Sequence, residues 1–301
     1  MNSFLRIIAA LFTAFFSGPA LCAVNVFACE PEWAALAQEL GGDKVSVFSA
    51  TTAKQDPHRI EARPSLIARV RSADLLICSG SELEIGWLPL LLTQSGNDRI
   101  QPGSPGYIEA SQFVARLEVP KVVDRSLGDI HPSGNPHIHL DPRNIESVGS
   151  VVSERLMQID QANAATYKTR AQSFRERWEA AMRRWKVKAA RLRGAPVVVY
   201  HRDMSYFINW AGMQEVGALE PKPGLPPTAS HLAQLVERMK RNRARAIVTS
   251  PYNNPQAAEF LSERAGIPVA PLPFTVGGTE KASDLFGLFD DTIDRLVATV
   301  Q

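Results

Sequence analysis

The sequence contains two series of alternating strand-like and helix-like segments, one on each side of a long stretch without glycine or proline. This pattern constrains the fold of the chain more than any other feature. In the first series, β-branched runs alternate with helical patterns: strands at 24–28, 45–49 and 74–78, helices at 31–40 and 64–71. The second series has strands at 197–200, 214–218, 245–249 and 269–272, with helices at 230–242 and 254–264. Such alternation predicts βαβ units with parallel sheets and right-handed connections. The predicted fold class is α/β, with two Rossmann-like lobes at 24–148 and 194–301.

The stretch between the lobes predicts one long, rigid helix over residues 149–193. Residues 150–193 contain neither glycine nor proline, and Phe174, Trp178, Ala181 and Trp185 follow the spacing of one helix face. At about 1.5 Å per residue, even 25 helical residues would span nearly 40 Å, which is the width of a domain. A stiff connection of this kind argues against a wide hinge motion between the lobes. Its basic residues at 183–193 are those of a solvated helix face, and with a net charge of +2 we expect no nucleic-acid partner.

The first 23 residues have the layout of a cleavable signal peptide. One positive charge in residues 1–6 precedes an apolar run at 7–16, and small residues lead to a cleavage site near Ala23. Cys22 suggests a lipoprotein instead, but Leu21 is bulkier than the residue that usually precedes a lipidated cysteine. We therefore expect a soluble, periplasmic protein without a transmembrane helix.

Two cysteines, Cys29 and Cys78, remain after the signal is removed. Each ends a strand-like run, VNVFAC and DLLIC. In an oxidising compartment they could form a disulfide, and the alternative is two buried thiols that act as small apolar side chains. The residues alone leave both interpretations open.

The six histidines are the best candidates for chemistry, because neutral imidazole is the commonest protein ligand for Zn²⁺. His58 lies in QDPHRIEARPS, His137 in the proline-bounded segment GNPHIHLDP, and His201 directly follows the apolar strand VVVY. Ligand-binding groups of open parallel sheets gather beyond the carboxyl ends of strands, which is where His201 falls. The wide spacings between these histidines match no compact metal motif. The residues alone therefore predict only a two-lobed exported protein with histidines near a cleft.

The order QDPH, GNPHIHLDP and YHRDMSYF resembles the substrate-binding proteins of zinc and manganese ABC transporters. RPSLIARVRSADLLICSGSELEIGWL also resembles the helix, strand and loop that follow the first ligand in that family, and the resemblance extends from about Val24 to the C-terminus. It implies two α/β lobes joined by a rigid helix, with the metal between them and His58, His137 and His201 as its ligands. It also implies delivery to a membrane permease with a cytoplasmic ATPase, by what we expect to be a monomer.

The sequence departs from the family at the fourth ligand. Members usually supply an aspartate after the last strand of the second lobe, where this chain has Pro273 and Phe274. The fourth position is then open, taken by water, or filled by a nearby carboxylate, for which the candidates are Glu280, Asp284, Glu61 and Asp203.

The other three histidines have weaker claims to the metal. His139 stands where the family often has an aromatic residue, which favours packing or support of the ligands over direct ligation. His131 is expected to be a solvated loop residue that could meet incoming metal, and His231 to be structural.

Three neutral nitrogens favour Zn²⁺ over Mn²⁺, which prefers oxygen donors. Because imidazole must be neutral to bind metal, affinity for the metal should fall as the pH drops through about 6.5.

Two alternative functions use the same histidines. One is a stand-alone periplasmic zinc chaperone or adhesin. The other is a zinc hydrolase with Glu61 or Glu280 as general base, but no hydrolase motif accompanies the histidines, and we expect no enzyme.

Overall fold

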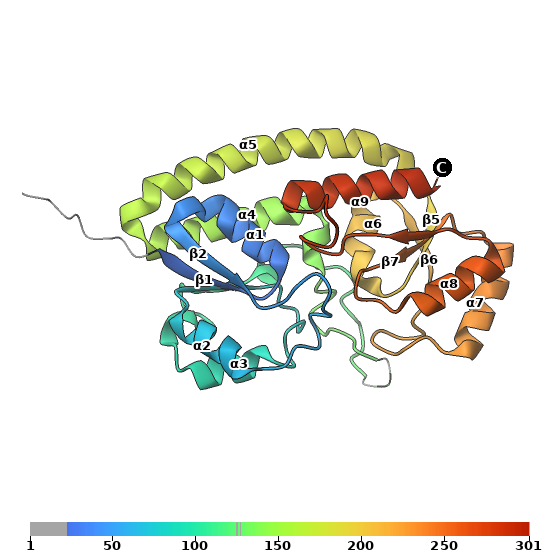
Figure 1. Ribbon diagram of the computed structural model, residues 1–301, viewed down its shortest axis with the longest axis horizontal. Helices are drawn as coiled ribbons and strands as arrows, with labels where there is room; N and C mark the ends of the chain where they lie inside the picture. Colours follow the sequence, from blue (N-terminus) through green and yellow to red (C-terminus); the bar gives the residue numbers. More distant parts are fainter. Residues whose placement is uncertain (1–22, 125, 127, 301) are drawn as a thin grey trace, which may run out of the picture.

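The protein has two parallel β-sheets, each of four strands, placed side by side with helices around them (Figure 1). The computed structural model describes residues 23–300 apart from 125 and 127, so the predicted signal peptide lies outside the described residues apart from Ala23. The strand orders are β2-β1-β3-β4 and β6-β5-β7-β8, and every pairing is parallel. The two-lobed α/β architecture predicted from the sequence is confirmed.

The strands have the following bounds: β1 Val24–Ala28, β2 Val45–Ser49, β3 Leu75–Cys78, β4 Tyr107–Glu109, β5 Pro196–Val199, β6 Gln214–Ala218, β7 Ala246–Thr249 and β8 Val269–Pro271. The helices are α1 Pro31–Gly41, α2 Pro64–Ser72, α3 Leu88–Ser95, α4 Pro142–Ile159, α5 Ala164–Ala189, α6 Ser205–Ala211, α7 Ala229–Arg241, α8 Pro255–Ala265 and α9 Leu285–Val300. All predicted strands are present to within a residue. The sequence analysis did not identify β4, α3, α6 or α9.

The predicted single helix over 149–193 is wrong at its beginning. Residues up to Ile159 belong to α4, and the long helix is α5, which packs against α4 along much of its length. The chain turns at Asp160, whose carboxylate accepts hydrogen bonds from the Asn163 side chain and the Tyr167 hydroxyl, both at 2.7 Å. Asp and Asn side chains compete with the helix backbone for hydrogen bonds, so this turn needs neither glycine nor proline.

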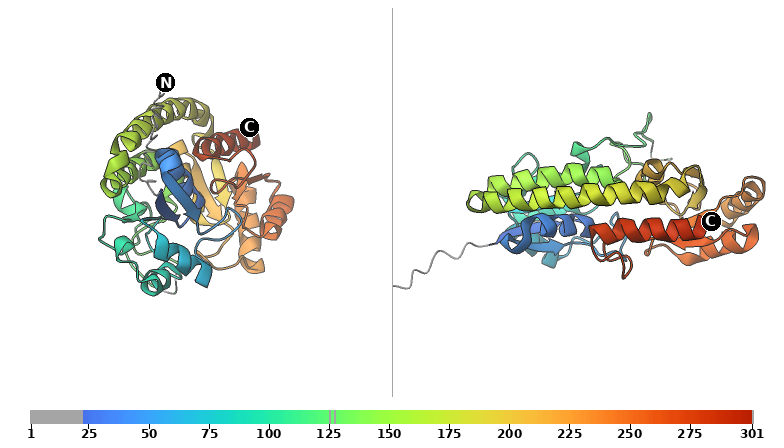
Figure 2. Two further views of the ribbon diagram at one scale, coloured as in Figure 1. Left: turned by 60° about the vertical axis from the view of Figure 1, so that its left-hand side comes forward. Right: turned by 90° about the horizontal axis from the view of Figure 1, so that it is seen from above.

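Helix α5 runs over both lobes and is held by an aromatic contact with α9 (Figures 1 and 2). The predicted face of α5 is buried, and the ring centroids of Trp178 and Trp185 lie 5.6 and 5.0 Å from that of Phe289 on α9. One buried apolar cluster extends from the first sheet through these helices to the second sheet. The lobes therefore share a core, which fixes their relative position more firmly than a linker would. The lobe boundaries at 148 and 194 stay a prediction.

Cys29 and Cys78 form a disulfide, which decides a question that the sequence left open. Cys29 directly follows β1, Cys78 ends the adjacent strand β3, and their Cα atoms are 4.8 Å apart. Within the described part of the chain, no helix has both the length and the apolar character needed to cross a bilayer.

We expect Trp185→Ala to lower the free energy of unfolding by about 3–5 kcal/mol, because it empties a fully buried site between α5 and α9. Urea unfolding followed by circular dichroism measures this. Val187→Ala is the control, since Val187 lies on the same helix but is 76% exposed; its effect should be under about 0.5 kcal/mol. Equal losses in the two variants would show that the α5–α9 contact does not hold the core.

Candidate metal centre

Three histidines that are far apart in the sequence meet between the two lobes. His58 lies in the loop after β2, His137 lies just before the short turn that leads into α4, and His201 lies just beyond β5. One ring nitrogen of each belongs to a group of atoms that all lie within 4.8 Å of one another. Their ring centroids are 5.4–5.6 Å apart, and the rings are steeply inclined to each other. The arrangement suits convergence of three imidazoles on one ion.

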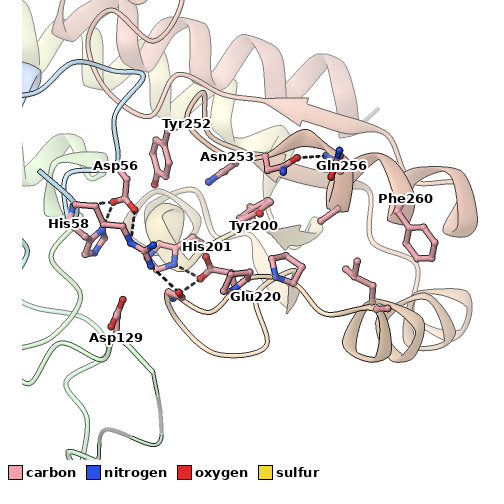
Figure 3. Close-up of a pocket in the computed structure, with 18 residues that line it drawn as sticks. Asp56, His58, Asp129, Tyr200, His201, Glu220, Tyr252, Asn253, Gln256 and Phe260 are labelled. Carbon is pink, nitrogen blue, oxygen red and sulfur yellow. Dashed lines mark hydrogen bonds and ion pairs between the residues drawn. The ribbon is translucent and has the colours of Figure 1, made fainter.

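Carboxylates orient two of these rings (Figure 3). The Nδ1 atom of His58 lies 2.7 Å from Asp56 Oδ1, and the Nδ1 atom of His201 lies 2.7 Å from Glu220 Oε2. A hydrogen bond donated by Nδ1 leaves Nε2 with its lone pair free, which is the usual way a protein prepares a histidine for metal. Burial acts to lower the pKa of His201, but the bond to Glu220 and the charges of Asp203 and Glu220 outweigh it and raise the pKa.

His137 is the most unusual of the three. It is 1% exposed, and neither of its ring nitrogens has a hydrogen-bond partner in the structure. Burial, together with the neighbouring His58 and His201, holds its pKa well below the ordinary value, so the ring is neutral. Buried polar atoms are nearly always satisfied, and a neutral ring with two unpaired nitrogens at the meeting point of other histidines is suited to a metal.

His131 lies at the site, although the sequence analysis expected a solvated loop residue. It is partly buried, and its Nε2 atom lies 3.2 Å from Nε2 of His58. Burial and the charge of His58 lower its pKa to about 4, so it is neutral at pH 7. It was missed because its contact with the opposite loop has no local sequence signal.

Phe274 occupies the position at which the family resemblance led us to expect a carboxylate. It is 2% exposed, and its ring meets those of His137 and His139 edge-on at 5.4 and 5.1 Å. His139 is equally buried: its Nε2 lies 2.9 Å from the carbonyl of Phe274, and its Nδ1 lies 3.0 Å from Glu32. The last contact is an ion-pair distance without hydrogen-bond alignment. His139 thus lies behind the site, packed between the lobes.

None of the four carboxylates proposed from the sequence joins the group of histidine nitrogens. Glu61 and Glu280 are exposed, and Asp284 is exposed at the start of α9, where it accepts a hydrogen bond from the backbone of Gly287. Asp203 is buried and accepts hydrogen bonds from Ser250 and Tyr252 at 2.6 and 3.0 Å, and burial raises its pKa. His231 also lies apart, with its Nε2 2.9 Å from the carbonyl of Ala218.

The two carboxylates that do support the site, Asp56 and Glu220, were not identified from the sequence. Asp56 had a local signal, because it precedes His58 by two residues in QDPH. Glu220 had only a topological one. It follows β6, the neighbour of β5, so both strands end beside each other at the same edge of the sheet.

A cavity of about 620 Å³ opens beside the site and extends into the second lobe (Figure 3). His58 and His201 lie at one end of it, and Tyr200, Tyr252 and Phe260 are among the residues further along. The site is therefore accessible from the cleft and covered on the other side by Phe274 and His139.

With this geometry established, comparison with known proteins assigns the chain to a family. The family model described as zinc-uptake complex component A, periplasmic (ZnuA), matches residues 26–299. The chain belongs to the ZnuA family. Family membership makes it a metal-binding, substrate-binding protein of an ABC transporter and confirms that it is a binding protein and not an enzyme.

Among curated relatives, the metal ABC transporter substrate-binding lipoprotein ScbA of Streptococcus cristatus is 21% identical over 266 residues, 87% of this chain and 83% of ScbA. The manganese ABC transporter lipoprotein scaA of Streptococcus gordonii is 22% identical over the same shares. The high-affinity zinc uptake protein ZnuA of Brucella abortus (strain 2308) is 25% identical over 125 residues, 42% of this chain and 37% of that protein. Because these relatives are named for different metals, the metal of this chain has to be argued from its own donor atoms.

Solved structures agree on the fold. A crystal structure of ZnuA superposes with a TM-score of 0.78 at 20% identity, covering 93% of this chain and all of that one. The manganese-bound form of a periplasmic metal-binding protein from Candidatus Liberibacter asiaticus gives a TM-score of 0.74 at 17% identity, covering 92% of this chain and all of that one.

We expect Glu220→Ala to weaken metal binding by about 10–100-fold without changing the stoichiometry, because His201 loses the partner that orients its ring. Competition titration against a chelating dye measures the change. Glu237→Ala removes the same charge from an exposed position on α7 and should bind normally. A similar loss in both variants would mean that overall charge, and not ring orientation, sets the affinity.

Proposed function

We propose that this protein captures Zn²⁺ in the periplasm between its two lobes and delivers it to a membrane permease driven by a cytoplasmic ATPase. His58, His137 and His201 hold the ion. Export by the predicted signal peptide and action as a monomer are part of the same proposal.

The nitrogen-only character of the site is the observation that supports zinc. The compact ligand group between the lobes contains three histidines and no carboxylate, and the apolar ring of Phe274 closes the side where an oxygen donor would lie. Mn²⁺ favours oxygen ligands, whereas Zn²⁺ is well satisfied by imidazole. The buried, neutral His137 adds a donor that needs no deprotonation before metal binds.

Capture with little domain movement agrees with the shared core. The ligands come from both lobes, but α5, α9 and the continuous apolar cluster hold those lobes together. The loops that carry His58 and His137 can order around an ion while the sheets stay in place. Release then requires the permease to disturb these loops, and not to pull the lobes apart.

We expect the mature protein, stripped with a chelator, to bind one Zn²⁺ per chain at submicromolar level. His58→Ala, His137→Ala and His201→Ala should each weaken binding by more than the roughly 10–100-fold that follows loss of an outer partner, because each removes a direct ligand. Calorimetry with elemental analysis measures both quantities, and competition with Mn²⁺ tests the choice of metal.

His231→Ala is the matched control, since the His231 ring contacts a backbone carbonyl in the second lobe, away from the site. The proposal fails if the stripped wild type takes up no zinc, if the three variants bind as well as the control, or if Mn²⁺ displaces Zn²⁺.

His131 is the fourth donor in our proposal. A tetrahedral ion with Zn–N bonds of about 2.0–2.1 Å separates its ligand nitrogens by about 3.3 Å, close to the 3.2 Å between Nε2 of His131 and Nε2 of His58. Because Asp56 accepts the Nδ1 proton of His58, the two facing nitrogens share one hydrogen bond before metal arrives. His131 lies outside the compact group of three, so it has to move inward when the ion binds.

Co²⁺ reports this fourth donor directly, because its visible d–d absorption depends on the ligands. We expect His131→Ala to shift and weaken the tetrahedral Co²⁺ spectrum and to lower Zn²⁺ affinity, while one ion still binds. His139→Phe is the comparison, because His139 packs behind the site and its substitution should leave the spectrum unchanged. An unaltered spectrum in His131→Ala would assign the fourth position to water.

A further inference from the structure

A second cluster of metal-ligating side chains lies at the carboxyl edge of the first sheet, apart from the histidine site. Cys29 directly follows β1, Cys78 ends the neighbouring strand β3, and both are at most 1% exposed. A carboxylate oxygen of Glu84, in the loop between β3 and α3, lies within 4.8 Å of both sulfur atoms. Glu84 is itself 3% exposed, so three potential ligands share one buried place.

A second buried carboxyl group, that of Glu30, adjoins this cluster. Glu30 directly follows Cys29, is 2% exposed, and its Oε1 atom has no hydrogen-bond partner. Its Oε2 and Oε1 of Glu84 both accept from the backbone N–H of Ser79, at 3.3 and 2.8 Å, which places the two carboxyl groups side by side.

Among the residues that the structure describes, no cationic side chain pairs with these two carboxyl groups. The charges that act on Glu30 are those of Glu84 and Glu32, both acidic, and together with burial they raise its pKa well above the ordinary value. Burial likewise raises the pKa of Glu84 to about 7. Burying two carboxyl groups together is costly unless a proton or a cation is shared between them, and the hydrogen bond between the side chains of Glu30 and Glu84 is the contact of a pair that shares a proton. Oε1 of Glu30 has no hydrogen-bond partner among the described residues, so it remains available as a ligand.

We propose that reduction of the Cys29–Cys78 disulfide creates a second, buried metal site, in which two thiolates and the carboxylates of Glu84 and Glu30 bind a thiophilic divalent cation such as Zn²⁺ or Cd²⁺. Thiolate sulfur and carboxylate oxygen are both established zinc ligands, and thiolate selects soft ions. The two positive charges of the cation balance those of the two thiolates, so metal binding itself adds no net charge to the buried edge. The redox state of Cys29 and Cys78 then determines whether the chain binds one metal ion or two.

The chemistry balances with an external thiol as reductant. Two thiol molecules give two electrons and two protons to the disulfide, so that their own sulfurs become joined and Cys29 and Cys78 become free thiols. Binding of the cation then releases both thiol protons to solvent. With metal–sulfur bonds of about 2.3 Å, the two sulfurs would separate to about 3.8 Å, a small movement for side chains on adjacent strands.

Titration with Cd²⁺ alone tests the proposal, because thiolate–cadmium bonds produce an ultraviolet charge-transfer band. Oxidised protein should bind one Cd²⁺ without the band. Protein refolded under a phosphine reductant, with both thiols verified by alkylation and mass spectrometry, should bind two, and the second should produce the band. In the reduced state, Glu84→Gln should weaken the second event by about tenfold or more, while its amide oxygen can still accept from Ser79 and Gly80.

Glu82→Gln is the matched control in the same loop, because Glu82 bonds Ser133 and not the sulfur cluster. His137→Ala should remove the first binding event and leave the second, which separates this site from the proposed zinc-capture site. Reduced protein that binds a single Cd²⁺ without the band, that cannot refold, or that responds equally to the two glutamine variants would overturn the proposal.

Discussion

The contact between α5 and α9 underlies everything else in this molecule, because it makes one rigid body of two lobes. The metal ligands come from loops of both sheets, so their nitrogens can converge only if the sheets hold a fixed relative position. Packed aromatic rings on α5 and α9, continuous with the cores of both lobes, supply that constraint. A site built across such a frame can accept an ion by rearranging loops, without the cost of moving domains.

On that frame, the site is prepared by carboxylates that never join the ligand group. Asp56 and Glu220 each take the Nδ1 side of a ring and leave its Nε2 free, whereas His137 is kept neutral chiefly by burial. Phe274 adds to this separation of oxygen from nitrogen groups, because its apolar ring lies where relatives are expected to carry an oxygen ligand. In the proposed site, the oxygen donors therefore orient the nitrogen donors and are not themselves ligands of the ion.

The sequence predicted what depends on local periodicity and motif order. The strands, the parallel α/β plan and the buried face at Trp178 and Trp185 follow from patterns within a few residues of each other. The three histidines were instead predicted from the family resemblance, through the order of their motifs along the chain. The helix break at Asp160 was not predicted, because the turn is held by hydrogen bonds from the Asn163 and Tyr167 side chains, and no glycine or proline marks it in the sequence. Glu220 and His131 were missed for a related reason: each reaches the site through the pairing of distant loops, which no local pattern records.

The buried acidic residues beside the disulfide of the first sheet could not be predicted from the sequence for the same reason. In the sequence, Cys29 and Cys78 are simply two strand-end cysteines, and nothing local marks Glu30 and Glu84 as buried acids. Only the parallel pairing of β1 with β3 brings all four to one buried edge without a basic partner. A buried acid pair beside a disulfide costs stability in the folded state, and selection for packing alone would replace it with apolar side chains. In the proposed reduced state, the cation exchanges for the two thiol protons, and the acid pair gives this edge the oxygen ligands that two cysteines alone would lack.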